Sequence, residues 1–151
     1  MPIAREPRAS LAPYETYPFQ QVLRRTAGRL PSKVAVIDGD RHFTYRELDR
    51  YSDQLAAALA TLGVARGDRV GLLAPNCAEF VIAFYGILKA GAVATTINSG
   101  YREREIAHQL NDSGAEMLIV HETLLGMADS ARDAVAGLQR LIPIVEGSED
   151  A

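Results

Sequence analysis

The fold of this chain is decided by residues Val70–Asn98, which read VGLLAPNCAEFVIAFYGILKAGAVATTIN. Val70–Ala74 is an unbroken apolar run, as expected of a strand that is covered on both faces. The residues from Glu79 to Gly91 then repeat apolar side chains at helical spacing, and Ala92–Ile97 has the pattern of a second strand. A strand, a helix and a strand in this order predict a right-handed crossover between two parallel strands.

The same alternation continues toward the C-terminus. It predicts a helix over Tyr101–Asn111, a strand over Glu116–Val120 and a weaker helix over Thr123–Ala136 that Gly126 interrupts. A last short strand, Leu141–Val145, contains a proline, which favours the edge of the sheet. The sequence therefore predicts an α/β fold with a mainly parallel sheet and helices on both faces.

The N-terminal part has a different pattern. A short amphipathic helix is expected over Phe19–Gly28. Lys33–Asp38 and Arg41–Thr44 flank the pair Gly39-Asp40, whose leading glycine favours a type II′ turn. We therefore expect a β-hairpin ahead of the parallel sheet.

The start of the helix after the hairpin is marked by a capping box. The Thr44 hydroxyl can accept a hydrogen bond from the Glu47 N–H while the Glu47 carboxylate reaches back. Leucine and tyrosine then recur every three or four residues and predict one apolar face: Leu48, Tyr51, Leu55, Leu59 and Leu62. Gly63 is expected to end this helix in the left-handed conformation. Asn76 and Glu79 predict a second, box-like cap at the next helix.

Composition indicates an ordinary soluble globular protein, with 48% apolar residues, 23% charged residues and a net charge of −3. No basic stripe suggests a nucleic-acid partner, and no run is long enough to form a transmembrane segment. Met1–Ser10 does not have the pattern of a signal peptide. Cys77 is the single cysteine, which suits a reducing, cytoplasmic location. Its position at a helix start allows a nucleophile, but a small, partly buried residue is the interpretation that we favour.

Three segments are expected along the chain. Residues 1–17, rich in proline and polar residues, predict a loose leader. Residues 18–146 form the α/β subdomain. Residues 147–151 are polar and are expected to be a truncated tail.

No familiar catalytic motif identifies an active site in this sequence. The sequence has no dinucleotide-binding, phosphate-loop, nucleophile-elbow or zinc-protease motif. The three histidines are predicted on separate elements, so a metal site is not expected. Asp38 and Asp40 are expected to serve a turn, and Asp49 and Asp53 to lie on a solvated helix face.

Five ordered segments resemble the adenylate-forming (AMP-binding) enzymes, closest to the branch of 4-coumarate-CoA ligases and fatty acyl-CoA synthetases. They are HFTYREL (42–48), LGVARGDRV (62–70), LLAPNCAE (72–79), LKAGAV (88–93) and EIAHQLNDSG (105–114). Each segment alone is a weak signal, but their order and spacing are those of the family. The resemblance implies a fragment of the large N-terminal domain of the adenylate-forming fold.

The resemblance also implies a reaction for a parent enzyme. A carboxylic acid attacks the α-phosphate of ATP, with Mg, to give an acyl-adenylate and pyrophosphate, and the thiol of CoA then displaces AMP. The family's phosphate-binding loop and adenylation lysine find no match in these 151 residues. Lys33 and Lys89 do not have the context of that lysine. We therefore expect no catalytic residue here, no tight cofactor binding and no activity of the fragment alone.

One loop is expected to lie near a ligand. In the family's acyl-CoA synthetases, the loop after the strand that follows LKAGA borders the channel for the pantetheine arm of CoA, and Ser99 and Gly100 occupy that loop here. Small residues allow a thin chain to pass close to the backbone. An ordinary loop with a helix-capping serine is the alternative. Many members have Asn-Pro where this chain has Asn98-Ser99.

Partners and alternatives follow from the same resemblance. The remainder of the parent's N-terminal domain is expected to pack against this subdomain, and an apolar helix face could instead form a homodimer. That face carries Phe80, Phe84, Ile87 and Leu88. Two other functions stay open: a stand-alone α/β binding module without catalysis, and part of a nonribosomal adenylation domain. The sequence does not identify the carboxylic acid.

Overall fold

The computed structural model describes residues 17–147. The predicted leader and tail lie outside this range apart from Tyr17 and Gly147, so both stay predictions. The elements are α1 (Gln20–Arg29), β1 (Val34–Asp38), β2 (Arg41–Thr44), α2 (Tyr45–Thr61), β3 (Arg69–Leu73), α3 (Ala78–Lys89), β4 (Val93–Ile97), α4 (Glu103–Ser113), β5 (Met117–His121), a 3₁₀ turn (Glu122–Leu124), α5 (Leu125–Arg132) and β6 (Arg140–Ile144).

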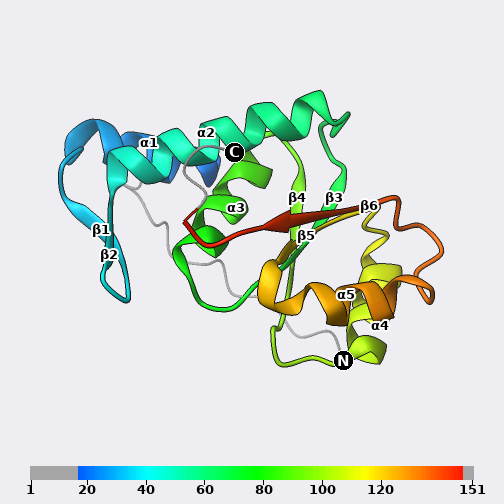
Figure 1. Cartoon of the computed structure of the whole chain (residues 1–151). Helices are drawn as coiled ribbons and strands as arrows, with labels where there is room; N and C mark the ends of the chain where they lie inside the picture. The colour runs from blue at the N-terminus through cyan, green and yellow to red at the C-terminus, as the bar shows by residue number, and fades with distance from the viewer. Residues whose placement is uncertain (1–16, 148–151) are drawn as a thin grey trace, which may run out of the picture.

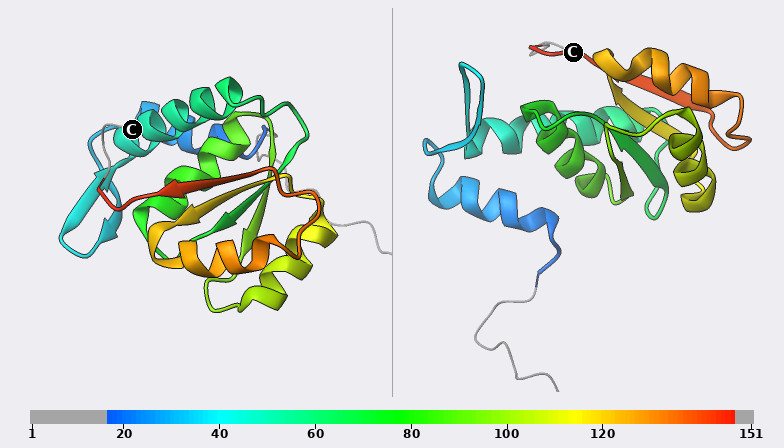
Figure 2. Two further views of the ribbon diagram at one scale, coloured as in Figure 1. Left: turned by 45° about the vertical axis from the view of Figure 1, so that its right-hand side comes forward. Right: turned by 90° about the horizontal axis from the view of Figure 1, so that it is seen from below.

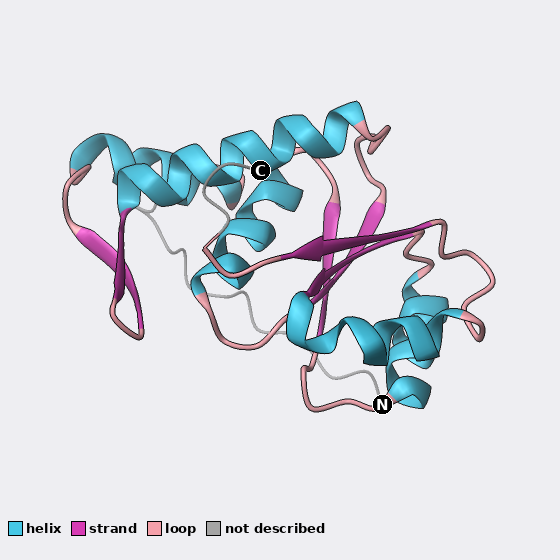
Figure 3. Ribbon diagram, viewed as in Figure 1, coloured by secondary structure: helices cyan, strands magenta, loops and turns pink. Residues whose placement is uncertain are grey.

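The described strands form two separate sheets (Figures 1 and 3). The larger sheet has the order β4-β3-β5-β6, and all of its strand pairs are parallel. β6 is an edge strand, as Pro143 predicts, and Pro143 lies opposite Val120 of β5. The predicted parallel sheet is therefore confirmed.

Helices cover both faces of this sheet, with α2 and α3 on one side and α4 and α5 on the other (Figure 2). On the first face Leu59 and Ile87 meet Leu72 and Ile119 from the strands. On the second face Ile106, Leu110 and Ala128 are among the residues that pack against Leu118 and Val120. The central strands are buried on both sides, which explains why β3 and β5 are continuous apolar runs.

The β1–β2 hairpin lies apart from the sheet (Figure 3) and packs with α1 in a third apolar cluster. Gly39 has φ +59°, and no non-glycine residue of the described chain has positive φ. This fits a type II′ turn, in which only the first central residue requires positive φ. Phe43 and Leu23 are buried in the cluster, so the hairpin is anchored through side chains.

Helix α2 begins as predicted, but its apolar face is shorter than the sequence indicates. Thr44 and Glu47 form the capping box, with the Thr44 N–H donating to the Glu47 carboxylate at 2.8 Å. Leu59 is fully buried, Leu55 is half-buried and Leu62 is exposed. The prediction for Leu62 was wrong because α2 ends at Thr61, so Leu62 leaves the helical register.

The predicted cap of α3 was wrong. The N-cap residue is Cys77, without a side-chain hydrogen bond, and Asn76 does not cap the helix. The Ala78 N–H instead donates to the Asp38 carboxylate at 2.9 Å. A carboxylate at a helix N-terminus satisfies a free donor and interacts favourably with the helix dipole. The cap therefore comes from the hairpin.

The last predicted helix is shorter than the expected Thr123–Ala136. A 3₁₀ turn occupies its start, and α5 ends at Arg132. Gly126 lies within α5 without breaking it. Val135 and Leu138 lie beyond the end of α5 and are still buried. The apolar residues after Arg132 therefore pack into the core without belonging to a longer helix. No helix between residues 17 and 147 is both long and apolar enough to cross a membrane.

Candidate functional site

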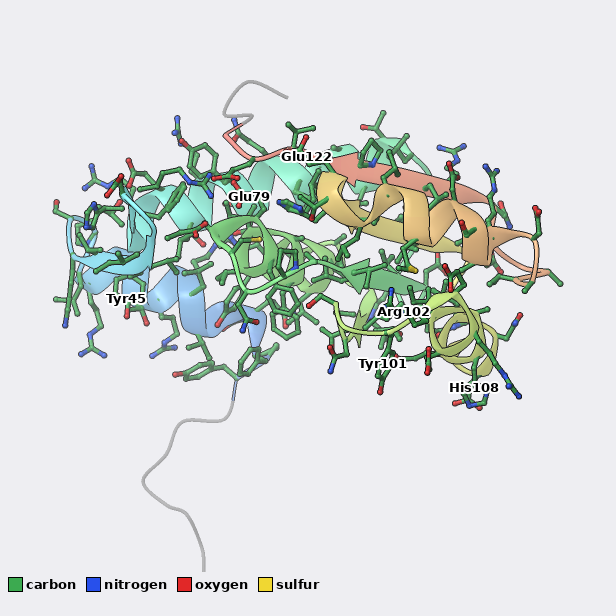
Figure 4. The ribbon with its side chains drawn as sticks, turned by 60° about the horizontal axis from the view of Figure 1, so that its bottom comes forward. Tyr45, Glu79, Tyr101, Arg102, His108 and Glu122 are labelled. Atoms are coloured by element: carbon green, nitrogen blue, oxygen red, sulfur yellow. The ribbon has the colours of Figure 1, made fainter. Side chains whose placement is uncertain are left out.

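The loops at the carboxyl ends of the parallel strands form the candidate site. In open α/β sheets ligands bind outside this edge. β4 ends at Ile97, and the five residues 98–102 connect it to α4. Figure 4 shows Tyr101 and Arg102 in this segment, with His108 further along α4. The loop contains both predicted site residues, Ser99 and Gly100.

The loop is closed by its first residue. The Asn98 side-chain oxygen accepts a hydrogen bond from the Gly100 N–H at 2.8 Å. The Asn98 carbonyl accepts a second bond from the Tyr101 N–H at 3.0 Å. Ser99 is half-buried, and Gly100 is exposed. The backbone at Ser99-Gly100 is thus presented at the surface by a tight turn.

Two side chains of α4 tie the loop to its neighbours. The Glu105 carboxylate accepts from the Arg102 N–H at 2.9 Å, where the helix begins. The Gln109 amide donates to the Thr96 carbonyl of β4 at 2.9 Å. The strand, the loop and the helix are therefore linked on both sides of the turn.

Gly100 does not require a left-handed conformation. It is absent from the glycines with positive φ, whereas Gly63, Gly91 and Gly114 are among them. A Cβ placed on Gly100 would lie 3.3 Å from the Asn98 side-chain oxygen, which is the one heavy atom within 4 Å of it apart from the neighbouring residues in the chain. A substitution at Gly100 therefore adds no strain from a positive φ, but its Cβ would be in tight contact with the Asn98 side-chain oxygen.

A second polar cluster joins the hairpin to α3 at the same edge. The Arg41 guanidinium contacts Glu79 and Asp38, each at 2.5 Å. Glu79 is 12% exposed at its side chain, and the Gly147 N–H also lies within 3.4 Å of its carboxylate. Asp38 bonds both Arg41 and the start of α3, so this cluster fixes the hairpin against the helix.

Sequence and structure comparisons identify the family. The sequence model of the AMP-binding enzymes matches residues 23–149, which is most of the chain. The chain belongs to the AMP-binding enzyme family.

Similar proteins include CoA ligases and a peptide synthetase. A long-chain-fatty-acid–CoA ligase of Salmonella typhimurium is 35% identical over 74% of this chain and 20% of its own length. A linear gramicidin synthase of Brevibacillus parabrevis is 34% identical over 83% of this chain and 2% of its own. The solved structure of an anthranilate CoA ligase in complex with anthranoyl-AMP has a TM-score of 0.80 at 35% identity, and the match covers 85% of this chain and 25% of that one.

The chain spans about a fifth of the length of the fatty-acid–CoA ligases that it matches. The expected α/β fragment of the adenylate-forming fold is confirmed by the solved relatives of this AMP-binding domain.

Lys89, within the LKAGA segment of this AMP-binding domain, joins two helices. Its ammonium contacts the carboxylates of Asp49 at 2.6 Å and Asp53 at 2.9 Å, and its side chain is 6% exposed. Asp53 also pairs with Arg24 of α1 at 2.8 Å. The prediction that Asp49 and Asp53 lie on a freely solvated face was therefore wrong. Lys89, which belongs to α3, instead pairs with both carboxylates of α2.

Cys77 has the environment of a structural thiol. It is half-buried and packs at the edge of the α2–α3 cluster. Burial, together with the nearby carboxylate of Glu79, raises the pKa of the Cys77 thiol. A raised pKa lowers the thiolate fraction, which disfavours nucleophilic chemistry at this position.

The residues from 17 to 147 offer no group of three or more His, Cys, Asp or Glu side chains that could hold a metal ion. Of the histidines, His121 is buried and its Nδ1 pairs with the Thr123 hydroxyl at 2.8 Å. His42 and His108 are exposed on other elements.

Asn98 and Asp38 are the site residues that sequence reasoning missed. Asn98 could have been found from its spacing, because asparagine often accepts a hydrogen bond from the N–H two residues later. Asp38 had no comparable signal, since its partner Ala78 is 40 residues away.

The Glu79–Arg41 pair predicts a pH-dependent stability. Burial acts to raise the pKa of Glu79, but its hydrogen bonds with Arg41, its own backbone and Gly147 outweigh burial and lower it. A depressed carboxyl pKa stabilises the fold above the unfolded value of about 4.3, and this contribution is lost as pH falls through the folded pKa.

We therefore expect wild type to exceed the Glu79→Gln variant in free energy of unfolding at neutral pH. The difference should shrink below about pH 4.3, as measured by denaturant titration at several pH values. A difference that stays constant down to about pH 3 would contradict a charge-based role for Glu79.

Proposed function

We propose that this chain is the N-terminal part of an AMP-forming acyl-CoA ligase. The observation that supports this proposal most is the match of the AMP-binding family over residues 23–149, together with the fold shared with solved CoA ligases. The substrate would be a small carboxylic acid, either a fatty acid or an aromatic acid. The location would be the cytoplasm.

The proposed reaction has two balanced halves. The acid's carboxylate oxygen attacks the α-phosphorus of ATP and expels pyrophosphate, which gives an acyl-adenylate. The sulfur of CoA then attacks the acyl carbon, loses its proton and expels AMP, which leaves a thioester. The described residues contain no match to the family's phosphate-binding loop, so the first half would depend on other parts of the enzyme.

The second half is the one to which this chain would contribute. We propose that the loop containing Ser99 and Gly100 borders the channel for the pantetheine arm of CoA. Two features support this: the loop follows a parallel strand at its carboxyl end, and Gly100 is exposed. A thin, uncharged chain could pass close to such a surface.

The remainder of the enzyme's N-terminal domain is the partner that we propose for this subdomain. An apolar groove of about 260 Å³ lies between the hairpin, α2, α3 and β6. Its lining includes Phe43, Tyr51, Leu55, Ile82, Ile142 and Ile144. Uncovered apolar surface of this kind marks a contact region.

A homodimer through α3 is less strongly supported. Ile87 is fully buried, and Phe80, Phe84 and Leu88 are half-buried. Phe19, ahead of α1, stacks on Tyr85 and meets Phe84 edge-on, so the chain covers part of this face itself. A two-fold dimer stays a proposal that sedimentation of the chain would test.

The proposed activity is tested by product analysis of a complete enzyme that contains this chain. Incubation with ATP, CoA and a panel of fatty and aromatic acids is expected to release AMP and pyrophosphate and to form a thioester. Release of ADP and phosphate would contradict the proposal. The 151-residue chain alone is expected to support no acid-dependent pyrophosphate exchange, and exchange by this chain would overturn our assignment of adenylation to other parts.

The similarity to the linear gramicidin synthase favours a second candidate, part of a nonribosomal adenylation domain. In that case the adenylate would form, but free CoA would not accept the acyl group and a carrier-protein thiol would. A third candidate, a non-catalytic α/β binding module, predicts no pyrophosphate exchange by any longer form of the protein.

A further inference from the structure

The segment between β4 and α4 is held by both side-chain and backbone hydrogen bonds. Residues 98–102 lie outside both the strand and the helix. Position 99 is serine, whose φ is not fixed by a ring as that of proline would be. The conformation of Ser99-Gly100 therefore depends on the hydrogen bonds around it.

Asn98 supplies two of these bonds from the start of the loop. Its side-chain oxygen accepts from the Gly100 N–H, and its carbonyl accepts from the Tyr101 N–H. The same side-chain oxygen is the only atom within 4 Å of a Cβ built on Gly100, outside its chain neighbours. The Asn98 amide oxygen thus lies against the side of Gly100 from which a side chain would project.

The helix side of the loop is fixed independently. Glu105 accepts from Arg102, and Gln109 donates to Thr96 of β4. Asn98 is consequently the one side chain with a described hydrogen bond inside the Ser99-Gly100 turn itself. Without it, the Gly100 N–H would turn to solvent while both ends of the loop stayed attached.

We infer that Asn98 is a positioning residue that holds the Ser99-Gly100 backbone in place for the thiol acceptor. This inference rests on the proposed function of the loop in binding the pantetheine arm of CoA. A loop that is already ordered loses less conformational entropy on binding. Loss of Asn98 should therefore weaken acceptor binding and leave adenylation unchanged.

The turn itself is tested by amide hydrogen exchange on the 151-residue chain. Exchange at the Gly100 N–H should become about fivefold faster in Asn98→Ala. It should return toward wild type in Asn98→Asp, because the carboxylate keeps an acceptor at the same position. Equal exchange in wild type and Asn98→Ala would overturn the inference.

The functional part is tested in a complete enzyme that contains this chain. Asn98→Ala should raise KM for CoA about fivefold, with pyrophosphate release in the absence of CoA unchanged, and Asn98→Asp should restore KM. A wild-type KM in Asn98→Ala would overturn the inference if Gly100→Leu still obstructs thioester formation. If Gly100→Leu also has no effect, the proposed channel fails, and the inference fails with it.

Discussion

Replacement of Leu59 by alanine is expected to lower the free energy of unfolding by about 2–5 kcal/mol. Leu59 has no exposed surface and lies between α2 and the sheet, against Leu72 and Ile87. The change removes buried methyl groups and leaves a cavity that close-packed neighbours cannot fill. Denaturant titration of the 151-residue chain measures the effect.

Leu62→Ala, at the residue directly after α2, is the matched control. Leu62 is 39% exposed, so its replacement should change stability by less than about 0.5 kcal/mol. Thr44→Ala, which removes the capping hydroxyl, should cost about 1 kcal/mol. If Leu59→Ala cost no more than Thr44→Ala, the position of α2 on the sheet would be wrong.

The parallel sheet could be predicted because its signals are local. β3 and β5 are apolar without interruption, since helices cover both of their faces. The capping box at Thr44 and the left-handed glycines at 63 and 114 mark helix ends within a few residues. Such signals need no knowledge of distant contacts.

Two of the errors arose where distant residues interact. Asp38 caps α3, and Lys89 binds Asp49, in each case across 40 residues. Local spacing favoured Asn76 as the cap, but the hairpin brings Asp38 to the same N–H group. The sequence pattern of α2 places Asp49 on the polar face of that helix. The packing of α3 against α2, however, brings the Lys89 ammonium beside the Asp49 carboxylate.

The candidate site was only partly predictable for a related reason. Ser99 and Gly100 have no chemical signature of their own, and they were selected by resemblance to a family. The structure adds the Asn98 turn and the exposure of Gly100.

The most direct test of the loop is Gly100→Leu in a complete enzyme that contains this chain. Thioester formation should fall at least about tenfold, which corresponds to about 1.4 kcal/mol in the barrier. Adenylation, measured as pyrophosphate release in a single turnover without CoA, should stay near wild type because ATP and the acid would bind elsewhere. Since Gly100 has no positive φ, backbone strain from a left-handed conformation would not contribute to the loss.

Two further variants separate obstruction from instability. Gly100→Ala adds only a Cβ, 3.3 Å from the Asn98 oxygen, so it should reduce thioester formation less than leucine does. Gly63→Leu places a side chain at φ +92° at the end of α2, where strain should lower the melting temperature and affect both half-reactions equally. If Gly100→Leu lowers both half-reactions in the same proportion, or lowers neither, then the loop has a structural role and the CoA channel lies elsewhere.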